Sequence, residues 1–286
     1  MLAIIGGSGL YKLSNAEILA EEIIETPFGP PSGPILRASL SQREVLFLAR
    51  HGAGHGLLPS EVNYRANIFA LKKAGTKAIL SVSAVGSLRE HIQPGDLVAV
   101  DQYLDFTKGK RQSTFFGEGL VGHIASAQPI SSILHGIICE QARALKLAKR
   151  NLHELGTYVC VEGPRLGTRA ESLMFRTLGA DVVGMTNTPE CFLAREAQIA
   201  YASLGVVTDF DSWQDDPSLH VEVSKIFSLY AEALEDVLSV IQKVSENYSE
   251  SDIEKCLSRN ALIQSLLTPE SSWSEKSREI VEVLRQ

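Results

Sequence analysis

Glycines surround a single hydroxyl residue in the first turn of this chain, where the sequence IIGGSGLY places Gly6, Gly7 and Gly9 around Ser8. Backbone that lacks Cβ atoms lets N–H groups approach an anion closely. A dinucleotide fingerprint would need a third glycine where Lys12 stands, and a P-loop would need a Gly-Lys-Ser/Thr sequence that does not follow. The segment therefore fits either a small-anion loop or a simple tight turn.

More groups that could bind an anion follow three later apolar runs. Arg50 and His51 come after EVLFLA, and a guanidinium can bind two phosphate oxygens while an imidazole adds another donor. Ser83 with Ala84, and separately Thr186, offer a hydroxyl and a backbone N–H at the ends of two other runs. Each of these segments is also explained as an ordinary turn when it is taken alone.

Two carboxylates follow a further apolar run, at Asp209 and Asp211. Residues two apart on an extended chain point to one side, so both carboxylates can face one ligand. A carboxylate accepts hydrogen bonds from an amino group, and a protonated carboxyl donates to a ring nitrogen, which would suit a nucleobase. The alternative from spacing alone is a pair of solvated loop acids.

The elements that must position these residues alternate along the chain. Short apolar runs that end in Gly, Ser, Thr or Asp are typical of buried strands that feed loops. Amphipathic stretches at 60–74, 131–149, 168–178 and 189–200 fit helices between them. The pattern predicts one α/β domain with a central mostly parallel or mixed sheet flanked by helices, and a binding site at the carboxyl ends of the strands. The apolar runs are LAII, EVLFLA, KAILSVSA, DLVAV, TYVCVEG, ADVVGM and YASLGVVTD.

Two helix starts carry capping signals. Thr168 and Glu171 predict a capping box, and Thr188 places a capping hydroxyl before Pro189 at a first helical position. Because Thr188 can serve as the cap, the Thr186 side chain is left for a ligand.

The chain turns helical from about residue 221, and its last part is polar with isolated apolar turns. We expect one domain at 1–245. At 246–286 we expect a helical extension that packs on the same domain or on a neighbouring subunit.

Composition limits the class of protein. The 286 residues are 44% apolar, enough for a sizeable core, and the net charge of −7 argues against a nucleic-acid partner. The densest basic spots, Lys72-Lys73 and Lys108 to Arg111, are expected on the solvated surface. Four scattered cysteines form no C-x-x-C pair, so we expect neither a zinc site nor disulfides, and a cytoplasmic location. The N-terminus lacks the charged region and the long apolar region of a signal peptide. No uninterrupted run of about 18 apolar residues predicts a membrane span.

Together these segments resemble the trimeric purine nucleoside phosphorylases, and among them the S-methyl-5′-thioadenosine phosphorylase branch. The resemblance runs from residue 1 to about 240 through the ordered motifs IIGGSGLY, ARHGAGH, PSEVNYRANI, SVSAVGSLRE, IQPGDLV, EGPR, RAESLMFRTLGADVVGM, TPE and TDFDSW. It implies a pentosyltransferase that phosphorolyses S-methyl-5′-thioadenosine to adenine and 5-methylthioribose 1-phosphate, in purine and methionine salvage. It also implies a homotrimer or a dimer of trimers, and no metal or organic cofactor, with inorganic phosphate as co-substrate.

The resemblance implies a role for each matching residue. Met185 would contact the sugar, and Asp209 with Asp211 would bind the purine, Asp209 being the catalytic acid that protonates N7. Asp209 stands where the branch that prefers 6-oxopurines has Asn, which points to adenine-type bases. His123 would be lent to the 5′ pocket of a neighbouring subunit. The phosphate would be held by Ser8, Arg50, His51, Ser83, Ala84 and Thr186.

The sequence departs from the branch at a few positions that bear on the substrate. Leu166 and Gly167 stand in place of an aromatic residue and a small hydroxyl residue near the purine. His220, with Val223 nearby, resembles the branch whose nucleosides carry a 5′-hydroxyl, and Gly184 also resembles that branch. A purine nucleoside phosphorylase with broader 5′ specificity, for adenosine, methylthioinosine or inosine, is therefore the alternative.

Two other classes compete with a phosphorylase. A hydrolase that uses water would not need the set of phosphate ligands. A non-catalytic nucleotide sensor or NAD-binding module would bind nucleotide without turnover, and the missing dinucleotide fingerprint counts against it.

Overall fold

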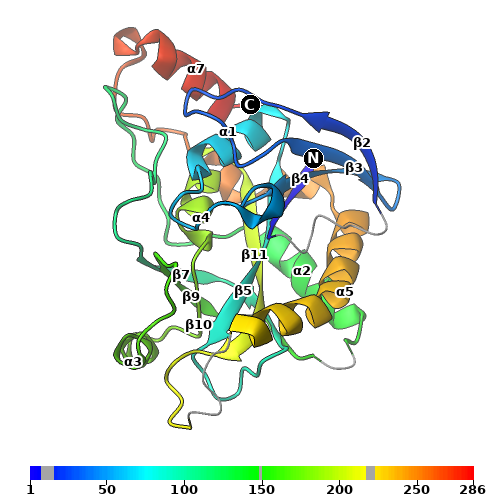
Figure 1. Ribbon diagram of the computed structural model, residues 1–286. Helices are drawn as coiled ribbons and strands as arrows, with labels where there is room; N and C mark the ends of the chain where they lie inside the picture. Colours follow the sequence, from blue (N-terminus) through cyan, green and yellow to red (C-terminus); the bar gives the residue numbers. More distant parts are fainter. Residues whose placement is uncertain (8–15, 148–149, 217–222) are drawn as a thin grey trace.

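Eleven strands in the described part of the chain join one mixed sheet (Figure 1). The computed structural model describes residues 1–7, 16–147, 150–216 and 223–286, apart from the side chains of 223–225. Of the residues expected in the site, Ser8 and His220 lie outside these ranges, as does the Val223 side chain. The strands are β1 (Leu2–Gly6), β2 (Ala16–Glu22), β3 (Ile35–Leu40), β4 (Arg43–Ala49), β5 (Ala78–Ser87), β6 (Leu97–Val100), β7 (Gln102–Phe106), β8 (Leu152–His153), β9 (Thr157–Val161), β10 (Val182–Gly184) and β11 (Ala200–Phe210).

The sheet branches at β5, which pairs with β1, β10 and β11. Its pairings with β1 and β11 are parallel, and its pairing with β10 is antiparallel. The register places Gly6 opposite Ala49 of β4 and Ile5 opposite Ser81 of β5. The ends of β1 and β4 and the middle of β5 therefore lie along one edge of the sheet.

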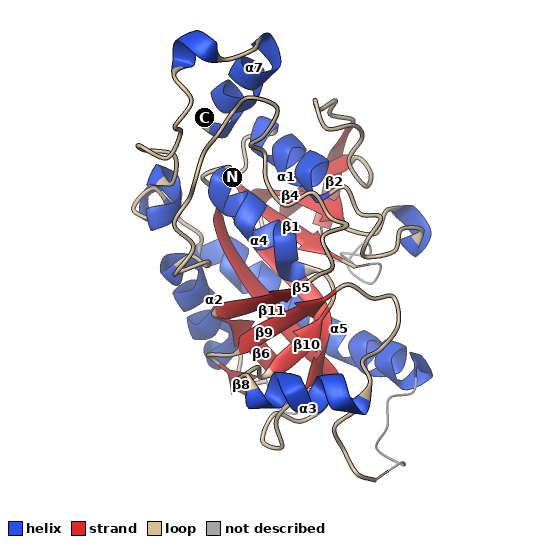
Figure 2. Cartoon of the chain, turned by 90° about the vertical axis from the view of Figure 1, so that its left-hand side faces the viewer, coloured by secondary structure: helices blue, strands red, loops and turns tan. Residues whose placement is uncertain are grey.

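Helices cover both faces of the sheet, so the molecule has three layers (Figure 2). On one face α1, α4 and α7 share a hydrophobic core with the strands, and on the other face α2 and α5 do so. None of the helices in the described ranges combines the length and apolar content needed to cross a bilayer. The helices are α1 (Tyr64–Lys73), α2 (Ser132–Ala144), α3 (Arg169–Thr177), α4 (Asn187–Glu196), α5 (Val223–Asn247), α6 (Glu250–Ile253) and α7 (Glu275–Leu284).

The α/β class is confirmed, and all seven apolar runs form strands. The sequence pattern misses β2, β3, β7 and β8. The strand β2 is exposed along most of its length, so its sequence AEILAEE shows neither a buried apolar run nor a clean alternation. The strand β8 has only two residues, too few for any periodicity.

One of the two predicted caps is confirmed. Thr168 Oγ1 accepts from the Glu171 amide at 3.2 Å, and Glu171 Oε2 accepts from the Thr168 amide at 2.8 Å, which completes the capping box of α3. In α4 the backbone of Thr188 is extended (φ −112°, ψ 136°), so regular helix does begin at Pro189. The Thr188 hydroxyl, however, is buried without a hydrogen-bond partner among the described residues, so its predicted capping role is wrong.

The predicted solvation of the two basic spots is wrong for one residue in each. Lys72 is 2% exposed, and burial together with the nearby charge of Arg259 lowers its pKa to about 7. Arg111 is 7% exposed and forms an ion pair with Glu162 at 2.9 Å. Charge density along the sequence cannot reveal such burial, because the residues that cover these two side chains come from distant segments.

The last residues of the chain pack on the rest of it. Ile280, Val281 and Leu284 of α7 are buried in the same core cluster as α1, and Figure 1 shows α7 beside α1 at one end of the molecule. The Leu284 carbonyl also accepts a hydrogen bond from Gln198 Nε2 at 3.3 Å. These contacts tie the C-terminal helix to α4 and α1.

We predict that Leu284→Ala lowers the free energy of unfolding by about 2–5 kcal/mol, because it leaves a cavity at a fully buried position. Glu282→Ala, on the exposed side of the same helix, is the matched control and should change stability by no more than about 0.5 kcal/mol. Urea denaturation measures both. Equal effects would contradict the packing of α7 on the core.

Candidate active site

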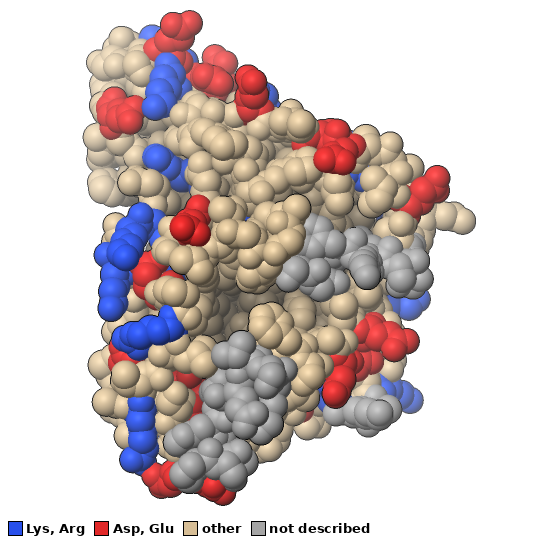
Figure 3. Space-filling model, in the orientation of Figure 1, with Lys and Arg blue, Asp and Glu red and all other residues tan. Residues whose placement is uncertain are grey.

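A cavity of about 520 Å³ lies where β5, β10 and β11 approach the loops after β1 and β4, and α5 closes its other side. Figure 3 shows that the surface of this face is hollowed near its centre. Most of the described residues expected in the site line this one cavity. They are Arg50, His51, Ser83, Ala84, Leu166, Gly167, Met185, Thr186, Asp209 and Asp211.

His123 is the described residue that the structure does not bring to the cavity. Its side chain is exposed, and its amide donates to the Ser265 carbonyl at 2.9 Å. Exposure on the surface of one chain is compatible with the expected loan to a neighbour.

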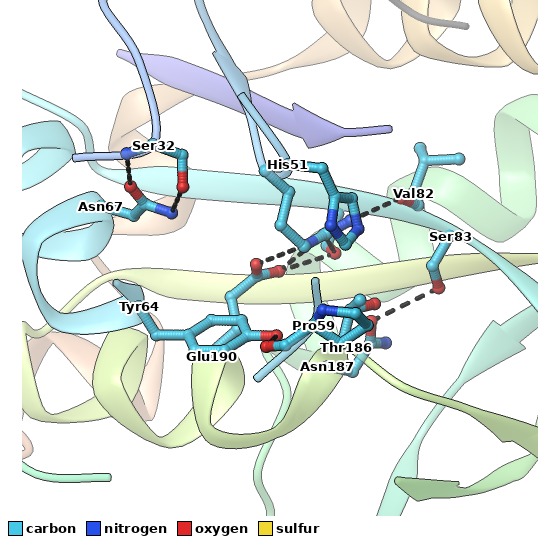
Figure 4. A network of polar contacts seen from close by, with 12 residues as sticks. Ser32, His51, Pro59, Tyr64, Asn67, Val82, Ser83, Thr186, Asn187 and Glu190 are labelled. Atoms are coloured by element: carbon cyan, nitrogen blue, oxygen red, sulfur yellow. Dashed lines mark hydrogen bonds and ion pairs between the residues drawn. The ribbon is translucent and has the colours of Figure 1, made fainter. Parts of the chain in front are cut away.

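A buried ion pair holds the cation of the cavity. Arg50 and Glu190 are each 1% exposed, and Arg50 Nε and Nη2 donate to the two carboxylate oxygens at 2.7 and 2.9 Å. Glu190 Oε1 also accepts from the hydroxyls of Ser81 and Tyr201, each at 2.9 Å. Figure 4 draws hydrogen bonds at the Glu190 carboxylate as dashed lines. The sequence analysis had no role for Glu190, because its partner lies 140 residues away along the chain.

The ion pair limits what Arg50 can offer to a ligand. Besides the two bonds to Glu190, Nη2 donates to Ser81 Oγ at 2.7 Å and Nη1 to the Val82 carbonyl at 3.1 Å. A guanidinium has five N–H groups. One Nη1 N–H is therefore left without a partner among the described residues, so the expected two-oxygen grip on phosphate is reduced to a single hydrogen bond beside a permanent charge.

His51 is held in one tautomer. Its Nδ1 lies 2.9 Å from the Leu57 carbonyl oxygen, which can only accept, so Nδ1 carries the hydrogen. Burial and the neighbouring Arg50 charge lower the pKa of His51 to about 4. The ring is neutral at pH 7, and Nε2 then offers a lone pair. The imidazole therefore offers the cavity an acceptor at Nε2, in place of the expected donor.

Two hydroxyls face the same end of the cavity. Ser83 and Thr186 are each 7% exposed, and the Thr186 Oγ1 is buried without a partner among the described residues. The Ser83 Oγ lies 3.4 Å from Asn187 Oδ1, the contact drawn in Figure 4. An orphaned buried hydroxyl beside a cation is a group prepared for an anion.

A β-bulge directs Asp209 into the cavity. The β5–β11 register shifts between Val207 and Asp209, which leaves Thr208 as the extra residue. The Thr208 Oγ1 lies 2.7 Å from Asp209 Oδ1. A Cβ on Gly86, which lies opposite Asp209 in β5, would come within 3.0 Å of Asp209 Oδ2. The missing side chain of Gly86 is therefore what gives the carboxyl its room.

The environment of Asp209 and Asp211 disfavours the ionised form of both carboxyls. Burial is the main cause that raises the pKa of Asp209 to about 6, and the nearby Asp211 raises it further. Burial also raises the pKa of Asp211, whose Oδ2 has no hydrogen-bond partner among the described residues. Gly167 lies beside this pair, because a Cβ there would be 3.5 Å from Asp211 Oδ2.

The helix α5 supplies an apolar wall that the sequence analysis did not assign. Ile226, Phe227, Ala231 and Leu234 line the cavity on the side opposite the strand ends, together with Tyr230. Their spacing at i, i+1, i+4, i+5 and i+8 is that of one helix face, a signal present in the sequence. It could not be distinguished there from an ordinary core face.

Arg111 fixes the segment between β10 and α4. Its Nη1 donates to the carbonyls of Met185 and Thr188 at 2.7 and 2.8 Å, and its Nε donates to Glu162 at 2.9 Å. Met185 and Thr186 are thereby held in place from behind.

No group of three or more His, Cys, Asp or Glu side chains in the described ranges is arranged to hold a metal ion.

A branched mixed sheet with a cationic end and a buried acid end in one cavity fits the architecture of a nucleoside phosphorylase. The family comparison agrees, since residues 1–243 match the model of the phosphorylase superfamily. The chain belongs to this family.

Relatives and solved structures narrow the comparison. An S-methyl-5′-thioadenosine phosphorylase of Geobacter sulfurreducens is 39% identical over 287 residues, which cover 99% of this chain and 97% of the relative. The crystal structure of a methylthioadenosine phosphorylase from an antarctic soil metagenomic library has a TM-score of 0.93 at 43% identity and covers 99% of this chain and 98% of that one. A variant of the adenosine/methylthioadenosine phosphorylase from Schistosoma mansoni, in complex with methylthioadenosine, has a TM-score of 0.86 at 32% identity, with 93% and 98% covered.

We predict that Glu190→Gln lowers the free energy of unfolding by about 3–5 kcal/mol, because it leaves the Arg50 charge buried without its counter-charge. Glu254→Gln breaks the exposed pairs with Lys77 and Arg259 and should cost at most about 1 kcal/mol. Chemical denaturation compares the two variants. If Glu190→Gln costs no more than Glu254→Gln, the ion pair does not have the structural weight assigned to it.

Proposed function

We propose that this chain catalyses the phosphorolysis of S-methyl-5′-thioadenosine, in which inorganic phosphate displaces adenine and 5-methylthioribose 1-phosphate is formed. One observation carries the proposal. Asp209, whose pKa is raised to about 6, and the group of Arg50, His51, Ser83 and Thr186 line the same cavity. A site of this kind can bind an oxyanion and protonate a leaving base in one event.

Phosphate would bind at the Arg50 end. The donors there would be the Arg50 N–H that has no partner among the described residues, the hydroxyls of Ser83 and Thr186, and the Ala84 backbone N–H, and Ser8 would add a further hydroxyl. The neutral His51 would accept the remaining P–OH hydrogen at Nε2. In this arrangement the dianion HPO₄²⁻ keeps its charge toward the sugar, where it acts as nucleophile.

The purine would bind at the Asp209 end. Cleavage of the C–N bond moves electrons onto the base, so a proton delivered to N7 stabilises the leaving group. Asp209 would donate this proton and accept from the 6-amino group, directly or through Asp211. Leu166 and Gly167 would border the base, and Met185 would contact the sugar between the two ends. Negative phosphate below the sugar would offset its developing positive charge.

The 5′ substituent would contact the wall formed by α5. Ile226, Phe227 and Leu234 are apolar, so they suit a methylthio group better than a 5′-hydroxyl. Val223 and His220 are the further candidates for this pocket. The second candidate function is a purine nucleoside phosphorylase that also takes adenosine, methylthioinosine or inosine, and the glycine at position 184 and His220 favour it.

We further propose an oligomeric state, a cofactor requirement and a cellular location for the chain. A homotrimer, or a dimer of trimers, would let His123 reach the 5′ pocket of a neighbour. The reaction needs phosphate as co-substrate and uses the chain's own side chains, with no metal or organic cofactor. We also propose a cytoplasmic location and a phosphorylase domain at 1–245 with a helical extension at 246–286.

We predict that kcat/KM at saturating phosphate is highest for methylthioadenosine and roughly 10-fold or more lower for adenosine, because the apolar wall prefers the methylthio group. Methylthioinosine and inosine should follow, since Asp209 directs its one proton at N7 and then has only acceptor oxygens to face a 6-carbonyl oxygen. Rates of base release for the four nucleosides test this order. Equal values for methylthioadenosine and adenosine would favour the broader phosphorylase, and base release that is unchanged without phosphate would indicate a hydrolase.

We predict that kcat/KM falls as the pH rises above about 6, because the proton that Asp209 must donate is lost through this pKa. Asp209→Asn should lower kcat/KM for methylthioadenosine by roughly 10² to 10⁴, remove this limb of the profile, and shift relative preference toward 6-oxopurines. Asp215→Asn, at an exposed acid nearby, is the control. The titration of phosphate itself is common to all three proteins. An unchanged limb in Asp209→Asn would refute the assigned role.

A further inference from the structure

The backbone at Gly184 is crossed by a tyrosine from the neighbouring strand. A Cβ built on Gly184 would lie 2.1 Å from the hydroxyl oxygen of Tyr158 and 2.5 Å from its Cζ. The Tyr158 ring is fully buried, so it has little room to move aside. The phenol therefore occupies the space that any side chain at position 184 would need.

The Tyr158 hydroxyl is directed at the residue expected to hold phosphate. The Thr186 amide donates to it at 3.2 Å. Burial raises the pKa of Tyr158, so the group stays a neutral phenol that can accept this bond. The Thr186 side chain makes no capping hydrogen bond. Its Oγ1 lies near the Tyr158 hydroxyl but is buried with no partner within hydrogen-bond distance among the described residues. The amide of Thr186 is thus fixed from behind while the hydroxyl is left for the cavity.

A second tyrosine repeats the arrangement for the next residue. Tyr103 lies opposite Tyr158 in the β7–β9 pairing. The two rings pack edge to face, with their centroids 5.8 Å apart. Asn187 Nδ2 lies 3.4 Å from the Tyr103 hydroxyl and 2.5 Å from Ser203 Oγ. Two adjacent tyrosines therefore hydrogen-bond the residue before α4, Thr186, and its first residue, Asn187.

We propose that Tyr158 is a positioning residue for phosphate binding: its hydroxyl holds the Thr186 amide, Gly184 provides the space for it, and Thr186 Oγ1 is thereby presented to the phosphate. The proposal rests on the proposed function, in which Thr186 binds phosphate. A purely structural role for Tyr158 would instead affect stability and both substrates alike.

The test is Tyr158→Phe, which removes one oxygen and keeps the ring that fills the core. The KM for phosphate should rise roughly 3- to 10-fold, the size expected from a lost hydrogen bond, and the KM for methylthioadenosine should change less than about 2-fold. Tyr248→Phe is the matched control, because it also removes a buried tyrosine hydroxyl, but one that has no partner among the described residues, and Tyr248 does not line the active-site cavity. It should leave both KM values unchanged.

A double-mutant cycle with Thr186→Ala separates positioning from a general effect. Thr186→Ala should raise the phosphate KM less in the Tyr158→Phe background than in the unsubstituted protein, because the hydroxyl is already misplaced there. The shift of the thermal midpoint caused by inorganic phosphate alone gives the same comparison without turnover.

Three results would overturn the inference. These are an unchanged phosphate KM in Tyr158→Phe, equal rises in both KM values, and additive effects in the cycle. Failure of the proposed function is a different outcome, since the unsubstituted protein itself would then show no phosphate-dependent turnover.

Discussion

The arrangement of the cavity depends on one buried ion pair. A guanidinium that is 1% exposed is costly unless a carboxylate compensates it, and Glu190 does so through two hydrogen bonds. Arg50 follows β4 and Glu190 lies in α4, four residues after Thr186, so the pair joins two separate segments that border the cavity. The pair also uses up most of the Arg50 donors. What Arg50 can offer a ligand is a rigidly placed positive charge with one N–H that has no partner in the described part of the chain, which suits a small oxyanion.

At the opposite end of the cavity a buried carboxyl has no compensating cation among the main causes of its pKa shift. Burial with a second carboxyl nearby raises the pKa of Asp209. The bulge at Thr208 and the missing side chain of Gly86 place the carboxyl there. Two environments in one cavity thus separate a fixed positive charge from a carboxyl whose raised pKa lets it act as a proton donor, which is the combination that phosphorolysis requires.

Much of this could be predicted from the sequence, because apolar runs mark buried strands and parallel strands bring their ends together. Arg50, Ser83, Thr186 and Asp209 each end or follow such a run, and all line one cavity. The partners that tune them could not be predicted. The Glu190 pair, the Gly86 gap and the α5 wall depend on strand register and on packing between distant segments, which local patterns do not contain. The burial of Arg111 could not be predicted for the same reason, and β2 was missed because its exposed residues show no strand pattern.

The central claim is that the anion end and the acid end act on one substrate, with phosphate as the nucleophile. ³¹P NMR of the reaction of methylthioadenosine with inorganic phosphate tests this claim most directly, because it identifies the sugar product. The account predicts a sugar 1-phosphate resonance that grows in equal proportion to free adenine. Adenine release with inorganic phosphate left unconsumed would contradict it.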